Sequence, residues 1–405
     1  MTAPPRPQAM MSGAPPAPEH QVTLSNWRIA PFNAWAFHHV REVVPSADIP
    51  AARPAPLARI PVDPGALAVP AGADGAEMAL GAFFAESAGQ ALVVLHRGRL
   101  VVERYGPAYD GTRPHILFSV SKSLTSLLFG VLVEDGLLDP AALVTDLLPE
   151  VAGSAYDGAS FEHVLDMTVS TAFDESYLNA DGDYFRYRVA TSWNPAPLGA
   201  PPADLRGFLA TMTPGDGPHG EAFNYVSPNT DLLGWAIERA SGRRFAELFA
   251  ERIWQPMGAE APAYITVDRF GAPRSAGGIC ALPRDLARLG EMVRLRGLGL
   301  DGRPLVPGTW VDALWAGGDR AAWAHGDLLH LFPEGSYRAQ WYLTGLATGA
   351  IAALGIHGQW LLIDPVREVV IVKLSAQALP ADDALDVRNL AALDALAEAV
   401  ADRGA

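Results

Sequence analysis

The sequence predicts an α+β fold, in which an antiparallel sheet from the N- and C-terminal parts of the chain is flanked by helices and a helical region is inserted between them. Runs with strand character lie near both ends, at residues 91–103 and 360–374, and segments with helical periodicity fill the middle. This order does not fit a repeated strand–helix–strand alternation. We expect a single unit over residues 23–405, with its sheet part at about 73–118 and 340–405 and its helical part at about 119–339.

The N-terminal stretch is predicted to be mostly irregular. Residues 1–22 are rich in Pro and Ala and are interrupted by charges, so we expect a disordered tail. Aromatic side chains within residues 26–39 indicate an irregular arm that packs on the main body. Residues 50–72 are typical of an extended linker, and the apolar side chains of residues 74–87 favour a helix.

A hairpin and a long helix follow. Residues 91–95 and 100–103 flank Arg97-Gly98, which is a turn signal between β-branched runs. Apolar residues at helical spacing over 124–132 predict a helix that begins near Ser119. Residues 172–205 show little periodicity, which is typical of a functional or mobile loop. The other predicted elements are helices at 141–150, 160–167, 228–240, 245–254, 283–294, 308–316 and 387–400, and strands at 360–363 and 369–374.

Composition excludes several classes of function. The net charge of −15 and the pI near 5.1 argue against nucleic acid and an anionic membrane surface as partners. No run of apolar residues is long enough to span a membrane, and the first residues lack the apolar segment of a secretory signal, so we expect a cytoplasmic protein. The single cysteine, Cys280, excludes an internal disulfide and is predicted to be buried.

The segment Phe118-Ser119-Val120-Ser121-Lys122 carries the first catalytic candidates. Ser119 would stand at a helix N-terminus, where free N–H groups favour a developing negative charge, and Lys122 would lie one turn on along the same face. The chain contains two lysines among its 30 cationic residues, and only a lysine can lose its proton to act as a base. The alternative is a chance S-x-x-K match, with Ser119 as an ordinary helix cap.

Two further segments carry candidate residues. Tyr225 stands just before a predicted helix, and a phenol near a cationic amine can relay a proton, although a tyrosine packed at a helix entry would look the same. Glycines flank a strand start at residues 355–359, where a backbone N–H could join that of Ser119 in holding an oxyanion. The pair Asp174-Glu175 is interpreted as solvated loop charges without a catalytic role. We find no metal-ligand spacing, phosphate loop or dinucleotide fingerprint, and expect no cofactor.

In sequence order, these three segments resemble the serine-reactive β-lactamase and penicillin-binding-protein superfamily, in its class C and esterase branch. The resemblance runs from about residue 90 to 375 and implies a β-lactamase-like fold. Within this superfamily, several sequence segments are similar to those of the 6-aminohexanoate-dimer hydrolases, which are nylon-oligomer amidases that also cleave carboxyl esters. That similarity is carried by residues 27–46, 118–124, 225–231, 335–341 and 355–359.

The resemblance implies a role for each matching residue. Ser119 matches the nucleophile, Lys122 its base and Tyr225 the tyrosine that relays protons to the leaving group. The backbone N–H groups of Ser119 and Ile356 match the oxyanion hole. Tyr177 matches a loop tyrosine at the scissile amide nitrogen, Tyr342 matches an aromatic of the pocket, and we also count Arg188 and His357 as substrate-binding. The resemblance further suggests a homodimer.

The sequence departs from the resemblance at two places. Ile356-His357-Gly358 stands where β-lactamases carry K-T-G, so their carboxylate-binding lysine is missing, which argues against β-lactam turnover. Arg188 stands where the amidases offer an acidic residue to the substrate's amine, with Asp181 and Asp183 as alternatives nearby. An arginine there would suit an ester or an acidic amide better than an amino-terminated oligomer.

We therefore expect a serine hydrolase that cleaves a small amide or ester through an acyl-enzyme. Three alternatives remain: a carboxylesterase with no amidase role, an enzyme like a β-lactamase or DD-peptidase, and a non-catalytic ligand-binding module of the same fold. The complete Ser-Lys-Tyr set argues against the binding module, because a binder has no need of a base. The missing K-T-G and secretory signal argue against the β-lactamase or peptidase.

Overall fold

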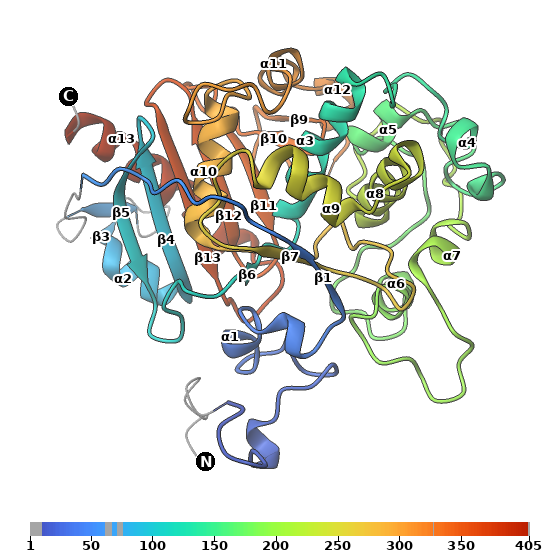
Figure 1. Cartoon of the computed structure of the whole chain (residues 1–405), viewed down its shortest axis with the longest axis horizontal. Helices are drawn as coiled ribbons and strands as arrows, with labels where there is room; N and C mark the ends of the chain where they lie inside the picture. The colour runs from blue at the N-terminus through green and yellow to red at the C-terminus, as the bar shows by residue number, and fades with distance from the viewer. Residues whose placement is uncertain (1–9, 61–66, 71–75, 327, 404–405) are drawn as a thin grey trace.

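The centre of the protein is a seven-stranded antiparallel sheet, which extends from the left side of Figure 1 to its middle. The computed structural model describes residues 10–60, 67–70, 76–326 and 328–403. In spatial order the strands are β5 (Arg99–Tyr105), β4 (Gly89–His96), β13 (Val369–Ser375), β12 (Gln359–Asp364), β11 (Ile351–Gly355), β10 (Trp341–Leu343) and β9 (Ser336–Arg338).

The two ends of the chain meet in this sheet, as the sequence predicts. Strand β13 pairs with β4, and Val372 lies opposite Val93. Alternate residues of these strands face opposite sides, so each face is apolar and needs a cover. Helix α10 (Pro283–Arg294) packs on one face, and α2 (Leu80–Glu86) and α13 (Asp383–Arg403) pack on the other (Figure 1).

The helical part lies on the right of Figure 1, around the contact between α3 (Val120–Glu134) and α8 (Ser227–Ser241). Both helices are buried over most of their length, and their first turns bury polar side chains, among them Lys122 of α3 and Asp231 of α8, together with apolar ones. Helix α8 ends at Gly242, whose φ of 67° is the left-handed conformation that favours glycine. The other helices of this part are α4 (Val144–Leu147), α5 (Phe161–Leu165), α6 (Asp183–Ala190), α7 (Leu205–Leu209), α9 (Phe245–Phe249), α11 (Gly308–Ala316) and α12 (Arg320–Trp323).

The N-terminal arm is folded onto this body. Strand β1 (Ser46–Ile49) extends a four-stranded sheet of order β1-β7-β8-β6, with β7 (Ala263–Thr266), β8 (Ile279–Ala281) and β6 (His115–Ile116). The short helix α1 (Asn33–Ala36) and the side chains of Trp27 and Phe37 pack with Ile116, Trp193 and the buried Cys280. The arm therefore covers the strand that leads into α3.

Several sequence predictions differ from the structure. Residues 10–22 belong to the predicted disordered tail, yet Met10 and Val22 are buried against the arm, while residues 1–9 lie outside the described residues. The helix predicted at 74–87 is shorter, because strand β3 (Glu77–Ala79) precedes α2 and pairs with β2 (Ala68–Pro70). The predicted loop 172–205 contains α6. In each case contacts with distant residues outweigh weak local signals.

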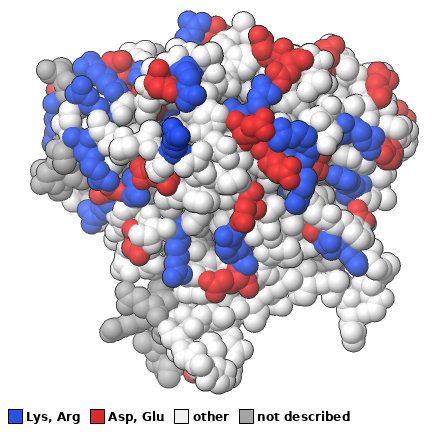
Figure 2. Space-filling view, viewed as in Figure 1, with Lys and Arg blue, Asp and Glu red and all other residues white. Residues whose placement is uncertain are grey.

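Acidic and basic side chains are interspersed over the face shown in Figure 2, and the arm at its lower edge carries few charges. Within the described part of the chain, no helix combines the length and the apolar character that crossing a bilayer requires.

Candidate active site

Ser119 stands at the junction of β6 and α3, as the sequence predicts. It is the N-cap residue of α3, and Lys122 lies one turn further along the helix. The Lys122 ammonium nitrogen Nζ is 2.8 Å from Ser119 Oγ. Phe118, directly before the serine, has a φ of 45°, a conformation in which non-glycine residues are strained. This turn presents the serine hydroxyl at the helix N-terminus.

Lys122 is a buried amine with a fixed orientation. Its Nζ also donates to Ser227 Oγ at 3.0 Å and to the Ala276 carbonyl at 2.9 Å. Removal from water disfavours the charged form and lowers the pKa of Lys122 to about 7, against a smaller opposing effect of the nearby Glu175 carboxylate. A substantial share of Lys122 is therefore neutral near pH 7, which is what a proton acceptor for Ser119 requires.

Tyr225 joins the serine and the lysine. Its ring centroid is 4.9 Å from Lys122 Nζ, and its side chain shares hydrogen bonds with the Ser119 and Tyr342 hydroxyls. Burial, reinforced by Glu175, raises the pKa of Tyr225 above its ordinary value. The phenol therefore stays protonated, so it can donate a proton rather than act as a standing phenolate. The three predicted residues meet at one place.

Glu175 is a member of this cluster that the sequence reasoning missed. The Ser227 N–H and hydroxyl both donate to its carboxylate, and the Tyr177 hydroxyl donates to Oε1 at 3.3 Å. Burial raises the pKa of Glu175, while the Lys122 charge works in the opposite direction. The prediction that it is a solvated loop charge is wrong, because a serine distant in sequence binds it. No local pattern distinguishes such a glutamate from a loop charge.

The backbone of Ile356 lies beside that of Ser119. Gly355 comes so close that a Cβ there would lie 3.1 Å from the Ser119 backbone N and 2.6 Å from the Leu117 carbonyl. Only glycine permits this approach. His357 follows with a φ of 62°, and its ring centroid is 5.5 Å from that of Phe118. The chain thus places the two predicted oxyanion donors on adjoining segments.

An open cavity of about 310 Å³ begins at these residues. Tyr177 and Tyr342 line it, as expected for substrate-binding residues. The other lining residues are Ser119, Tyr225, Leu328, His330, Leu331, Leu354, Gly355, Ile356, Trp360, Pro380, Ala381, Asp383 and Asp386. The cavity therefore combines the hydroxyl groups of the site with apolar side chains and with two carboxylates at the start of α13, and His330 Nε2 lies 3.5 Å from Asp383 Oδ1.

Arg188 and His357, which the sequence analysis counts as substrate-binding, are not among the residues that line the cavity. Arg188 lies on α6 and donates to the Tyr177 carbonyl at 3.2 Å, so it supports the cavity wall from outside. His357 is buried, and its Nδ1 is 2.7 Å from the Gln377 carbonyl oxygen. Of the alternatives near Arg188, Asp181 is exposed and Asp183 pairs with Arg186.

Comparison with known proteins identifies the family. The family model for beta-lactamase matches residues 82–396. The chain belongs to the beta-lactamase family. The 6-aminohexanoate-dimer hydrolase of Paenarthrobacter ureafaciens is 39% identical over 362 residues, which is 89% of this chain and 90% of that protein.

Solved structures of other proteins show the same fold as this chain. A Bacillus anthracis protein provisionally named a 6-aminohexanoate-dimer hydrolase superposes with a TM-score of 0.85 at 25% identity, over 94% of this chain and 97% of that one. A D-stereospecific amidohydrolase from Streptomyces shares the fold, with a TM-score of 0.57 at 17% identity over 75% of this chain and 93% of its own. The predicted family and fold are confirmed, and this member of the beta-lactamase family is a hydrolase.

Proposed function

We propose that this chain hydrolyses linear amides and esters of the 6-aminohexanoate type through an acyl-enzyme on Ser119. The observation that carries the proposal is the 2.8 Å contact between Ser119 Oγ and the buried amine of Lys122, at the mouth of an open cavity. A nucleophile hydrogen-bonded to a base of near-neutral pKa is the arrangement that covalent catalysis needs. The relative from Paenarthrobacter ureafaciens adds the substrate class.

Acylation begins when neutral Lys122 takes the proton of Ser119. The serine oxygen then bonds to the substrate carbonyl carbon, and the N–H groups of Ser119 and Ile356 hold the resulting oxyanion. When the oxyanion collapses, the carbon–nitrogen or carbon–oxygen bond breaks and Tyr225 gives its proton to the leaving group. Lys122 returns a proton to Tyr225, so the pair ends this half-reaction neutral.

Deacylation uses the same groups in reverse order. A water molecule gives a proton to Tyr225 as Tyr225 passes its own proton to the neutral Lys122, while the water oxygen attacks the ester carbon of the acyl-enzyme. Collapse of the second oxyanion breaks the bond to the serine oxygen, which takes its proton back from Lys122. The carboxylic acid product leaves, and Ser119, Lys122 and Tyr225 are back in their starting state.

The charges that line the cavity support an amino-terminated substrate. Arg188, which would have favoured an acidic group, lies outside the lining, whereas Asp383 and Asp386 are part of it. The same lining includes the apolar side chains of Leu354 and Trp360, which suit a methylene chain. A negatively charged wall raises the local concentration of cationic ligands over anionic ones.

Replacement of Ser119 by Ala tests the proposal. We expect wild type to release amine from the linear 6-aminohexanoate dimer and to cleave p-nitrophenyl butyrate, and we expect S119A to lose both activities by about 10,000-fold or more. The control is Ser126→Ala on the same helix, because the Ser126 hydroxyl is buried and has no hydrogen-bond partner among the described residues. It should retain wild-type rates.

Three results would contradict the proposal. An S119A variant with the wild-type rate would exclude the acyl-enzyme on this serine. Cleavage of the ester without release of amine from the dimer would indicate a carboxylesterase with no amidase role. Turnover of nitrocefin at a rate above that of the dimer would indicate a β-lactamase despite the missing K-T-G segment.

A further inference from the structure

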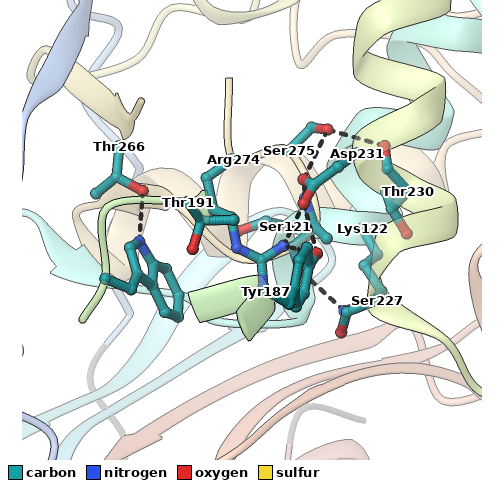
Figure 3. A network of polar contacts seen from close by, with 12 residues as sticks. Ser121, Lys122, Tyr187, Thr191, Ser227, Thr230, Asp231, Thr266, Arg274 and Ser275 are labelled. Atoms are coloured by element: carbon teal, nitrogen blue, oxygen red, sulfur yellow. Dashed lines mark hydrogen bonds and ion pairs between the residues drawn. The ribbon is translucent and has the colours of Figure 1, made fainter. Parts of the chain in front are cut away.

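A buried ion pair between Arg274 and Asp231 lies close to Lys122, and neither of its residues lines the cavity (Figure 3). Arg274 Nη1 is 2.6 Å from Asp231 Oδ2, and both side chains are essentially inaccessible to water. The Tyr187 hydroxyl donates to the same carboxylate oxygen and accepts from Arg274 Nη1. A buried pair like this one is weak evidence for added stability, so its role is better sought in what it holds in place.

The other carboxylate oxygen leads to Lys122. Asp231 Oδ1 accepts the backbone N–H of Ala276 at 2.8 Å, and the carbonyl of Ala276 accepts Lys122 Nζ at 2.9 Å. The Ser275 hydroxyl donates to the Thr230 carbonyl at 2.8 Å and fixes this backbone segment to α8. A shift of Asp231 would therefore move the carbonyl that orients the Lys122 amine.

Tyr187 connects this network to the cavity wall. It lies on α6, and its neighbour Arg188 donates to the Tyr177 carbonyl at 3.2 Å. Tyr177 lines the cavity and donates to Glu175, which in turn binds Ser227 beside Lys122. Helix α6 therefore touches both the wall that would face the substrate and the ion pair close to Lys122.

We propose that Tyr187 is a positioning residue, which couples the placement of the Tyr177 wall to the orientation of Lys122 through Asp231 and Ala276. The inference rests on the proposed function, since it assigns Lys122 the role of base. The hydroxyl of Tyr187 fixes the geometry of the ion pair, and it also shares the negative charge of Asp231. Without it, Asp231 would be less constrained and would present more of its charge toward Lys122.

The charged groups around Lys122 decide the sign of the electrostatic effect. Glu175 and Asp231 raise the pKa of Lys122, and Arg274 lowers it. Loss of the Tyr187 donor leaves more of the Asp231 charge unshared, which stabilises the Lys122 ammonium and raises its pKa. Since catalysis needs the neutral amine, the acid limb of the kcat/KM profile would then move to higher pH.

The test is Tyr187→Phe with Tyr156→Phe as the matched control. Tyr156 is also fully buried near Asp231, but its hydroxyl has no hydrogen-bond partner among the described residues. We expect Y187F to lower kcat roughly 10- to 100-fold with p-nitrophenyl butyrate and to shift the acid limb upward, since small displacements of a catalytic group have effects of this size. Y156F should keep both wild-type values.

Two further measurements are made on both variants. The thermal unfolding midpoint checks that each is folded, and the rate of covalent labelling by a fluorophosphonate measures the reactivity of Ser119. Y187F should label more slowly than Y156F, although both remain folded. Wild-type kcat and an unmoved acid limb in Y187F would overturn the inference, as would equal losses in the two variants. Failure of the proposed function is a separate result, because it would appear as full activity in S119A.

Arg188→Met keeps the inference testable if Y187F does not fold. This change breaks the contact with Tyr177 and leaves the ion pair intact. We expect KM for the 6-aminohexanoate dimer to rise roughly 10-fold and kcat to fall by a smaller factor, because the wall is released while Lys122 stays near its position. Unchanged KM and kcat would contradict the coupling.

Discussion

The two lysines of the chain occupy similar environments and have different neighbours. Lys122 and Lys373 are both about 1% exposed, and burial lowers the pKa of each to about 7. Lys122 Nζ contacts Ser119 and Ser227 beside the cavity. Lys373 Nζ donates to Ser375 Oγ at 2.7 Å, lies over the Phe83 ring and does not line the cavity.

The difference between them shows that a lowered pKa alone does not make a base. Any amine held in an apolar interior becomes easier to deprotonate, and Lys373 does so beneath α2 and α13 without an acceptor role. Lys122 gains its role from a serine hydroxyl at a helix N-terminus, with a phenol beside it. A shifted pKa identifies candidate catalytic residues, and the groups that each one contacts decide which of them can act.

The largest expected contrast is between Lys122→Met and Lys373→Met. Each change replaces a buried amine with an apolar chain of similar length. We expect K122M to lower kcat for p-nitrophenyl butyrate by about 100- to 10,000-fold, the usual contribution of a general base. K373M should stay within roughly threefold of wild type, because surface and core changes outside the reacting groups leave the chemistry in place. Steady-state kinetics on both variants measure the contrast, and equal losses would remove the distinction between the two lysines.

The second contrast is electrostatic. Glu175 raises the pKa of Lys122, and Asp386 raises the pKa of Lys373. Glu175→Gln should therefore lower the pKa of Lys122, so the acid limb of kcat/KM should move to lower pH, and the weaker base should lower kcat roughly 10-fold. The matched variant is Asp386→Asn, measured with the uncharged ester p-nitrophenyl butyrate. Its acid limb should coincide with that of wild type, and a shift there as large as in E175Q would refute the assignment.

The smallest expected effect concerns stability. The pKa of Lys373 is about 7 in the folded protein and about 10.4 in an unfolded chain, so between these values unfolding takes up a proton and the stability of wild type rises with pH. K373M lacks this dependence. We expect K373M to be more stable than wild type by about 1–4 kcal/mol at pH 7, and the difference to shrink toward pH 10. Urea unfolding at the two pH values measures it, and a difference that grows with pH would contradict the buried neutral amine.

Much of the site could be predicted from the sequence because the nucleophile and its base are close neighbours along the chain. Ser119 and Lys122 lie three residues apart, and helical spacing alone places them on one face of α3. Strand and helix patterns likewise predicted that β4, β5, β12 and β13 join one antiparallel sheet. Tyr225 was found because its motif precedes a helix in the expected order.

The rest depended on contacts that no local pattern encodes. Glu175 and Asp174 are adjacent acidic residues of one loop, yet Glu175 binds Ser227, 52 residues away, while Asp174 is exposed. Arg188 and His357 occupy positions that suggested substrate binding, yet their hydrogen bonds go to the carbonyls of Tyr177 and Gln377, and neither residue lines the cavity.

The sequence by itself determined the helix that presents Ser119 and Lys122, because periodicity and capping act between neighbours along the chain. Only the tertiary structure decided which distant charges face Lys122, since burial and Coulomb interactions depend on separation in space rather than along the sequence. The pKa of the base, the sign of the cavity wall and the link through Tyr187 all belong to that second category.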